Sequence, residues 1–166
     1  MAAWDGYEGY RRWLLVLASG AVVFGLMHHA DHVIRGNHSG YPFQAEVTPF
    51  TFSLLIYALI LPGIYLTARG RSVPGYHLFV AAVGLALLGF VHFVPTGDHE
   101  APIRDIYMIY DSPLAGVFAL GVLAGLIASV AAVGLVALGA IRGGSRSTDS
   151  RRGRTGRPAP TTSGRR

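Results

Sequence analysis

Four long apolar runs alternate with short polar segments along this chain. Residues 47–68 contain no Asp, Glu, Lys or Arg, and neither do residues 112–141. Between residues 76 and 94 the only ionisable side chains other than tyrosine are His77 and His92. A fourth run, at residues 13–27, precedes a histidine-rich segment. Because about 20 helical residues cross the hydrocarbon core of a bilayer, the pattern predicts an all-α integral membrane protein, a four-transmembrane-helix antiparallel bundle.

Capping signals set the expected ends of these spans. Thr48-Pro49 and Ser112-Pro113 are each typical of a helix start, with an N-cap residue before a proline at the first helical position. The first apolar run is too short to cross alone, so its helix must continue into the histidines that follow. Pro62 is expected to kink the second span. The expected spans are residues 13–34, 48–67, 74–94 and 113–141.

The positions of the arginines predict the orientation. They precede the first span, separate the second from the third, and follow the fourth, so an even number of spans places all three groups on one side. The positive-inside rule assigns that side to the cytoplasm. Residues 1–12 and the C-terminal tail are then cytoplasmic. Six of the nine acidic residues lie toward the outside: Asp31, Glu46, Asp98, Glu100, Asp105 and Asp111.

The tail, residues 142–166, accounts for the basic net charge of +5, because it holds eight arginines and a single acid, Asp149. Its remaining residues are mainly Gly, Ser, Thr and Pro, which cannot bury an apolar face, and we expect it to be disordered. A basic cytoplasmic tail is suited to anionic lipid at the bilayer surface. The charge does not belong to a folded surface, so no specific nucleic acid is expected as a partner.

Composition excludes several classes of function. Without cysteine the chain has no disulfide, thiolate ligand or cysteine nucleophile. It contains no P-loop, dinucleotide fingerprint, GxSxG or HExxH motif. The absence of lysine beside abundant Ala, Gly and Val favours a GC-rich prokaryotic genome and hence a prokaryotic cell membrane. Gly121 and Gly125 form a GxxxG pattern, for which packing inside the bundle is favoured over a homo- or hetero-oligomer contact.

The sharpest chemical feature is a group of ionisable residues at the end of the first span. His28, Asp31, His32 and Arg35 fall within an arc of about 100° on a helix, whereas His29 lies to one side. Such residues are costly against lipid. They are therefore expected to face the interior of the bundle or a watery cavity.

His92 is expected at the same depth as His28, since each lies about 15 residues from the start of a span running outward. His77 lies near the start of the third span, at the opposite end. Tyr110 and Asp111 are expected at the level of the cluster. Further polar residues are expected to support it: His29, Arg35, His38, Glu46 and His99.

The leading interpretation is a metal site for redox or hydrolytic chemistry. His28, His32 and His92 would be ligands to a divalent ion such as zinc or iron, with Asp31 as a ligand or an orienting carboxylate. A shared site needs His92 within about 10 Å of the other two histidines, because metal–nitrogen bonds are only about 2 Å long. Two alternatives stay open, as does whether the protein is an enzyme. One is a b-type haem or quinone site, and the other a non-enzymatic membrane subunit or scaffold with a structural polar network.

Overall fold

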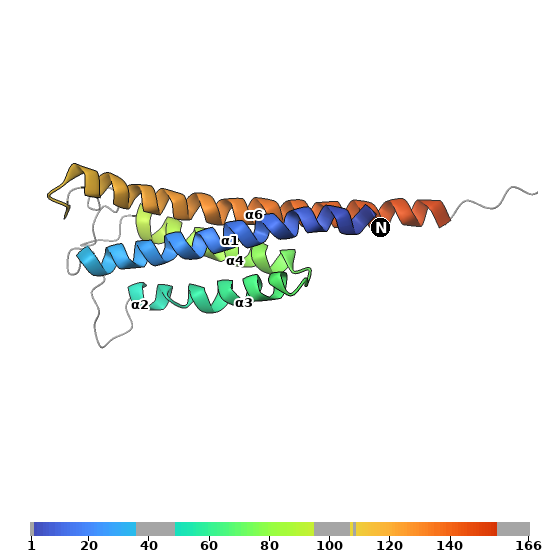
Figure 1. Cartoon of the computed structure of the whole chain (residues 1–166), viewed down its shortest axis with the longest axis horizontal. Helices are drawn as coiled ribbons and strands as arrows, with labels where there is room; N and C mark the ends of the chain where they lie inside the picture. Colours follow the sequence, from blue (N-terminus) through green and yellow to red (C-terminus); the bar gives the residue numbers. More distant parts are fainter. Residues whose placement is uncertain (1, 36–48, 95–106, 108, 156–166) are drawn as a thin grey trace, which may run out of the picture.

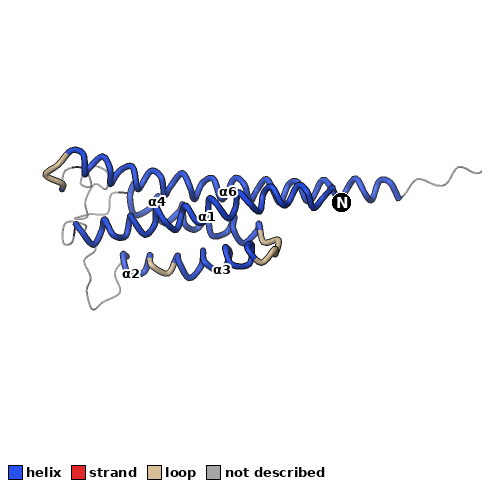
Figure 2. The backbone as a smooth tube through the Cα atoms, viewed as in Figure 1, coloured by secondary structure: helices blue, strands red, loops and turns tan. Residues whose placement is uncertain are grey.

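The computed structural model describes residues 2–35, 49–94, 107 and 109–155, with side chains for residues 8–35, 50–94, 107 and 109–144. Within these ranges the chain is helical and contains no strand. Figure 1 and Figure 2 show long helices running side by side along one axis. The helices are α1 (Ala2–Arg35), α2 (Pro49–Ser53), α3 (Ile56–Ala68), α4 (Pro74–Phe93) and α6 (Pro113–Thr155).

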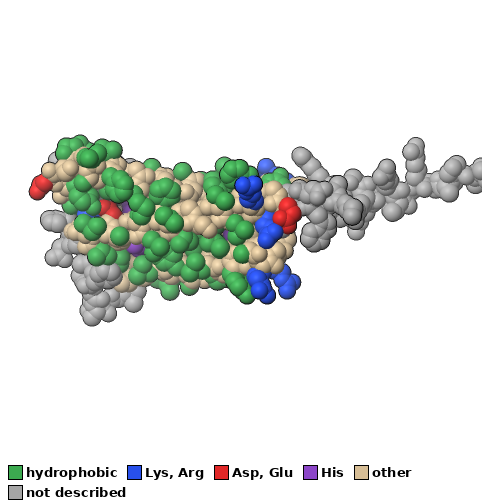
Figure 3. All heavy atoms as spheres, in the orientation of Figure 1, with side chains coloured by type: hydrophobic (Ala, Val, Ile, Leu, Met, Phe, Trp, Pro, Cys, Tyr) green, Lys and Arg blue, Asp and Glu red, His purple; other side chains and the backbone are tan. Residues whose placement is uncertain are grey.

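The prediction of four apolar spans is confirmed by length and composition. The segments long and apolar enough to cross a membrane are Glu8–Arg35, Phe50–Ala68, Pro74–Phe93 and Pro113–Gly144. Many large apolar side chains point away from the bundle, including Leu114, Leu135 and Phe118. Figure 3 shows such side chains along the middle of the visible face, with arginines gathered at the end where the N-terminus lies. This outer surface is the kind that a bundle embedded in lipid presents.

Small residues set the packing of the bundle. Helix α1 packs against α3 and α6, and α4 packs against α6 and α3. Alanines occupy much of the buried interior, whose residues are Leu14, Ala18, Ala21, Ile60, Val80, Ala81, Val133 and Ala137. Because alanine side chains are short, the backbones approach closely. The core therefore fixes how each helix is rotated about its own axis.

The turn between α3 and α4 holds those two helices in an antiparallel pair. Gly70 has a φ of 77°, and the backbone N–H groups of Arg71 and Gly70 donate to the carbonyls of Leu66 and Thr67. This is a Schellman motif, which needs a residue in the left-handed region and therefore favours glycine. Arg11 of α1 donates to the carbonyl oxygens of Thr67 and Ala68 at 3.1 Å each, so the start of α1 lies against this end of α3.

Some helix bounds differ from those expected. Helix α1 begins at Ala2, well before residue 13. The second span is interrupted at Leu54 and Leu55, between α2 and α3. Pro62, at which a kink is predicted, lies inside α3. The interruption replaces regular helical bonds with shorter-range ones, since the N–H of Leu55 donates to the carbonyl of Phe52. It also brings residues of α2 and α3 against α1, as described below.

Helix α6 ends later than expected. It continues to Thr155, so residues 142–155 are helical where a disordered tail was expected to begin. Adding a residue to an existing helix forms one more hydrogen bond without a new nucleus, and arginine is a good helix former. Residues 156–166 lie outside the described residues.

The two glycines of the GxxxG pattern occupy different surroundings. A Cβ added at Gly125 would lie 2.6 Å from a ring carbon of Phe24, whereas one added at Gly121 would meet no atom within 4 Å. Both substitutions by alanine gain the same helix propensity. We expect Gly125→Ala to lower the free energy of unfolding by about 1–3 kcal/mol relative to Gly121→Ala, through overpacking. Denaturation in mixed micelles measures the difference, and equal stabilities would contradict this packing.

Candidate metal centre

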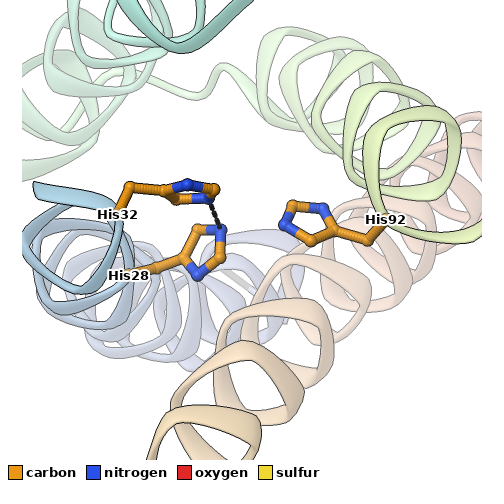
Figure 4. Close-up of side chains that lie close together, drawn as sticks. All are labelled: His28, His32 and His92. Carbon is orange, nitrogen blue, oxygen red and sulfur yellow. Dashed lines mark hydrogen bonds between the residues drawn. The ribbon is translucent and has the colours of Figure 1, made fainter. Parts of the chain in front are cut away.

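Three histidine side chains from two helices converge inside the bundle. His28 and His32 lie one turn apart in the last turns of α1, and His92 lies in the last turn of α4. Their imidazoles point toward one another in Figure 4. The ring centroid of His28 is 4.7 Å from that of His32 and 4.8 Å from that of His92, and the remaining pair is 6.1 Å apart. The expectation that His92 lies within 10 Å of both is confirmed.

The spacing of the ring nitrogens suits a single ion. One nitrogen from each histidine lies within 4.8 Å of the other two, an arrangement that could hold a metal ion. The Nε2 atoms of His28 and His32 are 3.2 Å apart. Two nitrogens bound to one tetrahedral zinc are separated by about 3.3 Å, given zinc–nitrogen bonds of about 2.0–2.1 Å. The pair on α1 is therefore already at ligand spacing, and an inward shift of His92 would complete the set.

All three imidazoles are buried, with His28 only 4 % exposed. Among the side chains that the structure describes, His28 Nδ1 and His92 Nε2 are buried ring nitrogens without a hydrogen-bond partner. Buried polar atoms are rarely left in that state. His92 Nδ1 lies 3.1 Å from the carbonyl oxygen of Leu88, which can only accept, so Nδ1 carries the proton. The Nε2 atom of His92 then presents a lone pair to the other two rings, the orientation that outer hydrogen bonds give to metal-binding histidines.

The pair on α1 is connected to a buried ion pair. Arg35 Nε donates to Asp31 Oδ2 at 2.9 Å, and Arg35 Nη2 donates to His32 Nδ1 at 3.4 Å. His32 consequently holds its proton on Nε2 and donates it to His28. A metal would replace that proton, so His32 must exchange tautomers and loosen its contact with Arg35 when an ion binds.

Asp31 lies beside the three histidines without joining them. One carboxylate oxygen accepts from Arg35, and the other accepts from the hydroxyl of Tyr110. Burial and the Asp31 carboxylate raise the pKa of Tyr110 to about 12, so the phenol stays protonated and donating at neutral pH. Asp31 is therefore not part of the group of three histidines, and it is connected to His32 only through Arg35.

His29 belongs to a second polar group on the other side of α1. Its Nδ1 lies 2.8 Å from both the carbonyl oxygen of Gly25 and the hydroxyl of Tyr57, and its Nε2 lies 2.9 Å from Ser53 Oγ. The Phe50 ring packs against both His29 and His32, with centroids 5.4 and 5.7 Å away. Phe50 therefore closes the end of the space between the two polar groups.

A cavity of about 110 Å³ opens beside both groups. Residues from α1, α2, α3, α4 and α6 line it. Most of the lining is apolar, and its polar residues are His28, His29, His32, Ser53, Tyr57 and His92. These six come from the end of α1, the end of α2, the start of α3 and the end of α4, so the cavity has one polar end and an apolar stem.

Sequence reasoning placed some of these residues and missed others. His77 lies at the opposite end, as expected, where its Nε2 is 2.7 Å from Thr67 Oγ1. Ser53 and Tyr57 were not anticipated as partners of the histidines. Their spacing of four residues at the histidine end of the second span is the signal that could have indicated them. The expected supporting residues His38, Glu46 and His99 lie outside the described residues, as do Asp98, Glu100 and Asp105.

Comparison of the chain with protein-family models, with curated proteins and with solved structures gave no match.

Proposed function

We propose that this protein is a multi-pass membrane protein that binds one divalent metal ion, zinc or iron, through His28, His32 and His92. The observation that carries the proposal is the convergence of three buried imidazoles from two helices, with the Nε2 lone pair of His92 facing the other two rings. Imidazole ligands suit zinc and iron, among other borderline metals. A metal would provide that lone pair with a partner inside an apolar interior.

The alternative of a purely structural network accounts less well for these side chains. It leaves a buried ring nitrogen on His28 and another on His92 unpaired. Each unpaired buried polar atom costs about 1–3 kcal/mol. The Asp31–Arg35 pair already connects successive turns at the end of α1, so a structural role does not require three histidines in contact.

A b-type haem fits the same residues less well than a single ion. Bis-histidine ligation needs two imidazoles on opposite faces of a flat macrocycle. Here the rings of His28 and His92 are in contact at 4.8 Å and tilted by 55°. A macrocycle would require these two rings to separate, whereas a single ion requires an inward shift of His92.

Three histidine ligands leave a further coordination position for water or substrate. This composition is typical of catalytic zinc sites, in contrast to structural sites with four protein ligands. A metal ion held by the three histidines would lower the pKa of a coordinated water or polarise an oxygen of a substrate. Outside the ligand set, Asp31 would keep its ion pair with Arg35, whose contact with His32 would loosen as the ion binds.

Metal loading tests the proposal directly. The protein is purified in detergent, stripped with a chelator and titrated with Zn²⁺ or Fe²⁺. We expect one equivalent per chain and an X-ray absorption spectrum with about three nitrogen ligands. The proposal is wrong if the protein takes up neither ion at micromolar concentration, or if the bound ion has only oxygen ligands.

We also propose that the arginine end of the bundle is cytoplasmic, which places the histidines near the outer face. Arg11 contacts the end of α3, and Arg69 and Arg71 lie at the turn that follows, so these charges share one end. The chain has no cysteine of its own. A cysteine introduced at Gly9 should therefore react with an impermeant maleimide only after the membrane is opened. Labelling in intact cells would show that the arginine end of the bundle faces outward.

A further inference from the structure

The cavity beside the three histidines is small and mostly apolar. Its volume is about 110 Å³, and apolar residues such as Val22, Ile60 and Val130 form most of its lining. Water stays in a cavity only where it finds polar partners, and an apolar cavity of about 150 Å³ remains dry and binds benzene or xenon instead. Because the volume here is somewhat less, the cavity has room for a small apolar molecule of about that size or below.

The polar group formed by His29, Ser53 and Tyr57 uses its own hydrogen-bond donors. Ser53 Oγ lies 2.6 Å from the carbonyl oxygen of Phe50, which can only accept, so the Ser53 hydroxyl donates there. Its oxygen then accepts from His29 Nε2 at 2.9 Å, and His29 Nδ1 accepts from the hydroxyl of Tyr57 at 2.8 Å. These side chains therefore keep their polar protons for one another and for the backbone, and a ligand in the cavity gains no hydrogen bond from them.

The unsatisfied polar atoms of the lining belong to the proposed metal site. Among the described side chains, the buried ring nitrogens of the lining that lack a partner are His28 Nδ1 and His92 Nε2. The second of these is directed at the position of the ion. A polar ligand would give up its hydrogen bonds to water in such surroundings without replacing them, whereas an apolar ligand has none to lose.

The cavity also lies close to the lipid-facing side of the bundle. Leu87 of α4 lines it and is 37 % exposed, so this side chain borders both the cavity and the outer surface. Small apolar molecules concentrate in hydrocarbon, because their transfer out of water is favourable. A molecule dissolved in the bilayer is therefore one side chain away from the cavity.

We propose that the cavity binds a small, uncharged, apolar molecule such as dioxygen and holds it against the open coordination position of the metal. The volume, the apolar lining and the internally satisfied polar group support the binding of such a molecule. Its contact with the ion follows because the three histidines belong to the same lining. This contact rests on the proposed function, whereas binding in the cavity does not.

Xenon is the probe, because it is apolar, uncharged and inert toward the metal. The full-length protein, with isotope-labelled valine methyl groups, is studied by NMR in nanodiscs under increasing xenon pressure, both metal-free and zinc-loaded. The methyl shifts of Val130, which lines the cavity, should saturate in both forms. Those of Val23, which is 56 % exposed, should change linearly as xenon dissolves in the lipid. Linear changes at both valines would overturn the inference.

A matched pair of variants checks the location. Val22→Phe adds bulk to the lining and should abolish the saturable shift at Val130, whereas Val23→Phe makes the same change at an exposed neighbour and should preserve it. A saturable shift that survives Val22→Phe would place the xenon outside the cavity and reject the proposal. If Val22→Phe does not fold, the comparison of Val130 with Val23 in the wild type still decides.

Paramagnetic broadening tests the contact with the ion. Fe²⁺ in such a site is paramagnetic and Zn²⁺ is not, so the resonance of bound xenon should be broader in the anaerobic iron-loaded protein than in the zinc-loaded one. Equal widths in a protein shown to hold iron would place the molecule away from the metal and reject the contact. Saturable xenon binding in a protein that takes up no metal would support the cavity and reject the metal site, and metal uptake with linear shifts alone would do the reverse.

Discussion

Alanine at His92 is expected to lower the affinity of the protein for Zn²⁺ by at least about 100-fold, and alanine at His28 or His32 should do the same. Loss of a group outside the ligand set already costs about 10–100-fold in metal affinity, and loss of a ligand costs more. Each of the three side chains is buried at the centre of the cluster, so no exposed neighbour can replace it readily. Competition with a chromophoric chelator measures the three affinities against the wild type.

His77 supplies the matched control for this series. It is a buried histidine on the same helix as His92, but it contacts Thr67 at the opposite end of the bundle. His77→Ala therefore removes a buried imidazole, at a similar cost in packing, without touching the cluster. Its affinity for Zn²⁺ should match that of the wild type. If all four variants lost the metal equally, the loss would reflect general destabilisation and not ligation by the three histidines.

Asp31→Ala is expected to lower the free energy of unfolding by about 3–5 kcal/mol, more than either Gly125→Ala or Glu8→Ala. Asp31→Ala takes away one partner of Arg35, a carboxylate 2.9 Å from a guanidinium whose side chain is 2 % exposed, and it also removes the acceptor of the Tyr110 hydroxyl. The buried guanidinium then loses the attraction of this carboxylate but keeps the cost of desolvation. Denaturation in mixed micelles, followed by far-UV circular dichroism, measures the loss.

The ion pair between Glu8 and Arg11 is the natural comparison. Its two nearest atoms are 3.0 Å apart, much like the 2.9 Å of the buried pair, but the Glu8 side chain is 58 % exposed. Water and salt screen such a pair, so Glu8→Ala should cost no more than about 1 kcal/mol. Similar losses in the two variants would show that burial contributes little at Asp31.

The part of the site that lies on one helix was predictable from the sequence. The helical period places His28, Asp31, His32 and Arg35 on one face, and the structure joins these four through hydrogen bonds. Such contacts follow from 100° of rotation per residue, whatever the rest of the fold does. The depth of His92 followed in the same way, by counting residues from the start of its span.

Contacts between helices could not be derived by counting. The contact of His92 with His28, and that of Tyr57 with His29, depend on how far each helix is rotated about its axis. That rotation is set by packing details such as the approach of Gly125 to Phe24. It also depends on the break between α2 and α3, for which the residues around Leu54 carry no glycine or proline signal.

The sequence by itself determined four apolar helices, the sorting of charges between their ends, and a face of ionisable residues at the end of the first. These follow from local properties: the length of each apolar run, the cost of charge in lipid, and the period of the helix. Only the tertiary structure decided that His92 completes the group, that Asp31 stands outside it, and that a cavity opens beside it. Those features depend on the fit of side chains from different helices, which close packing fixes and no single segment contains.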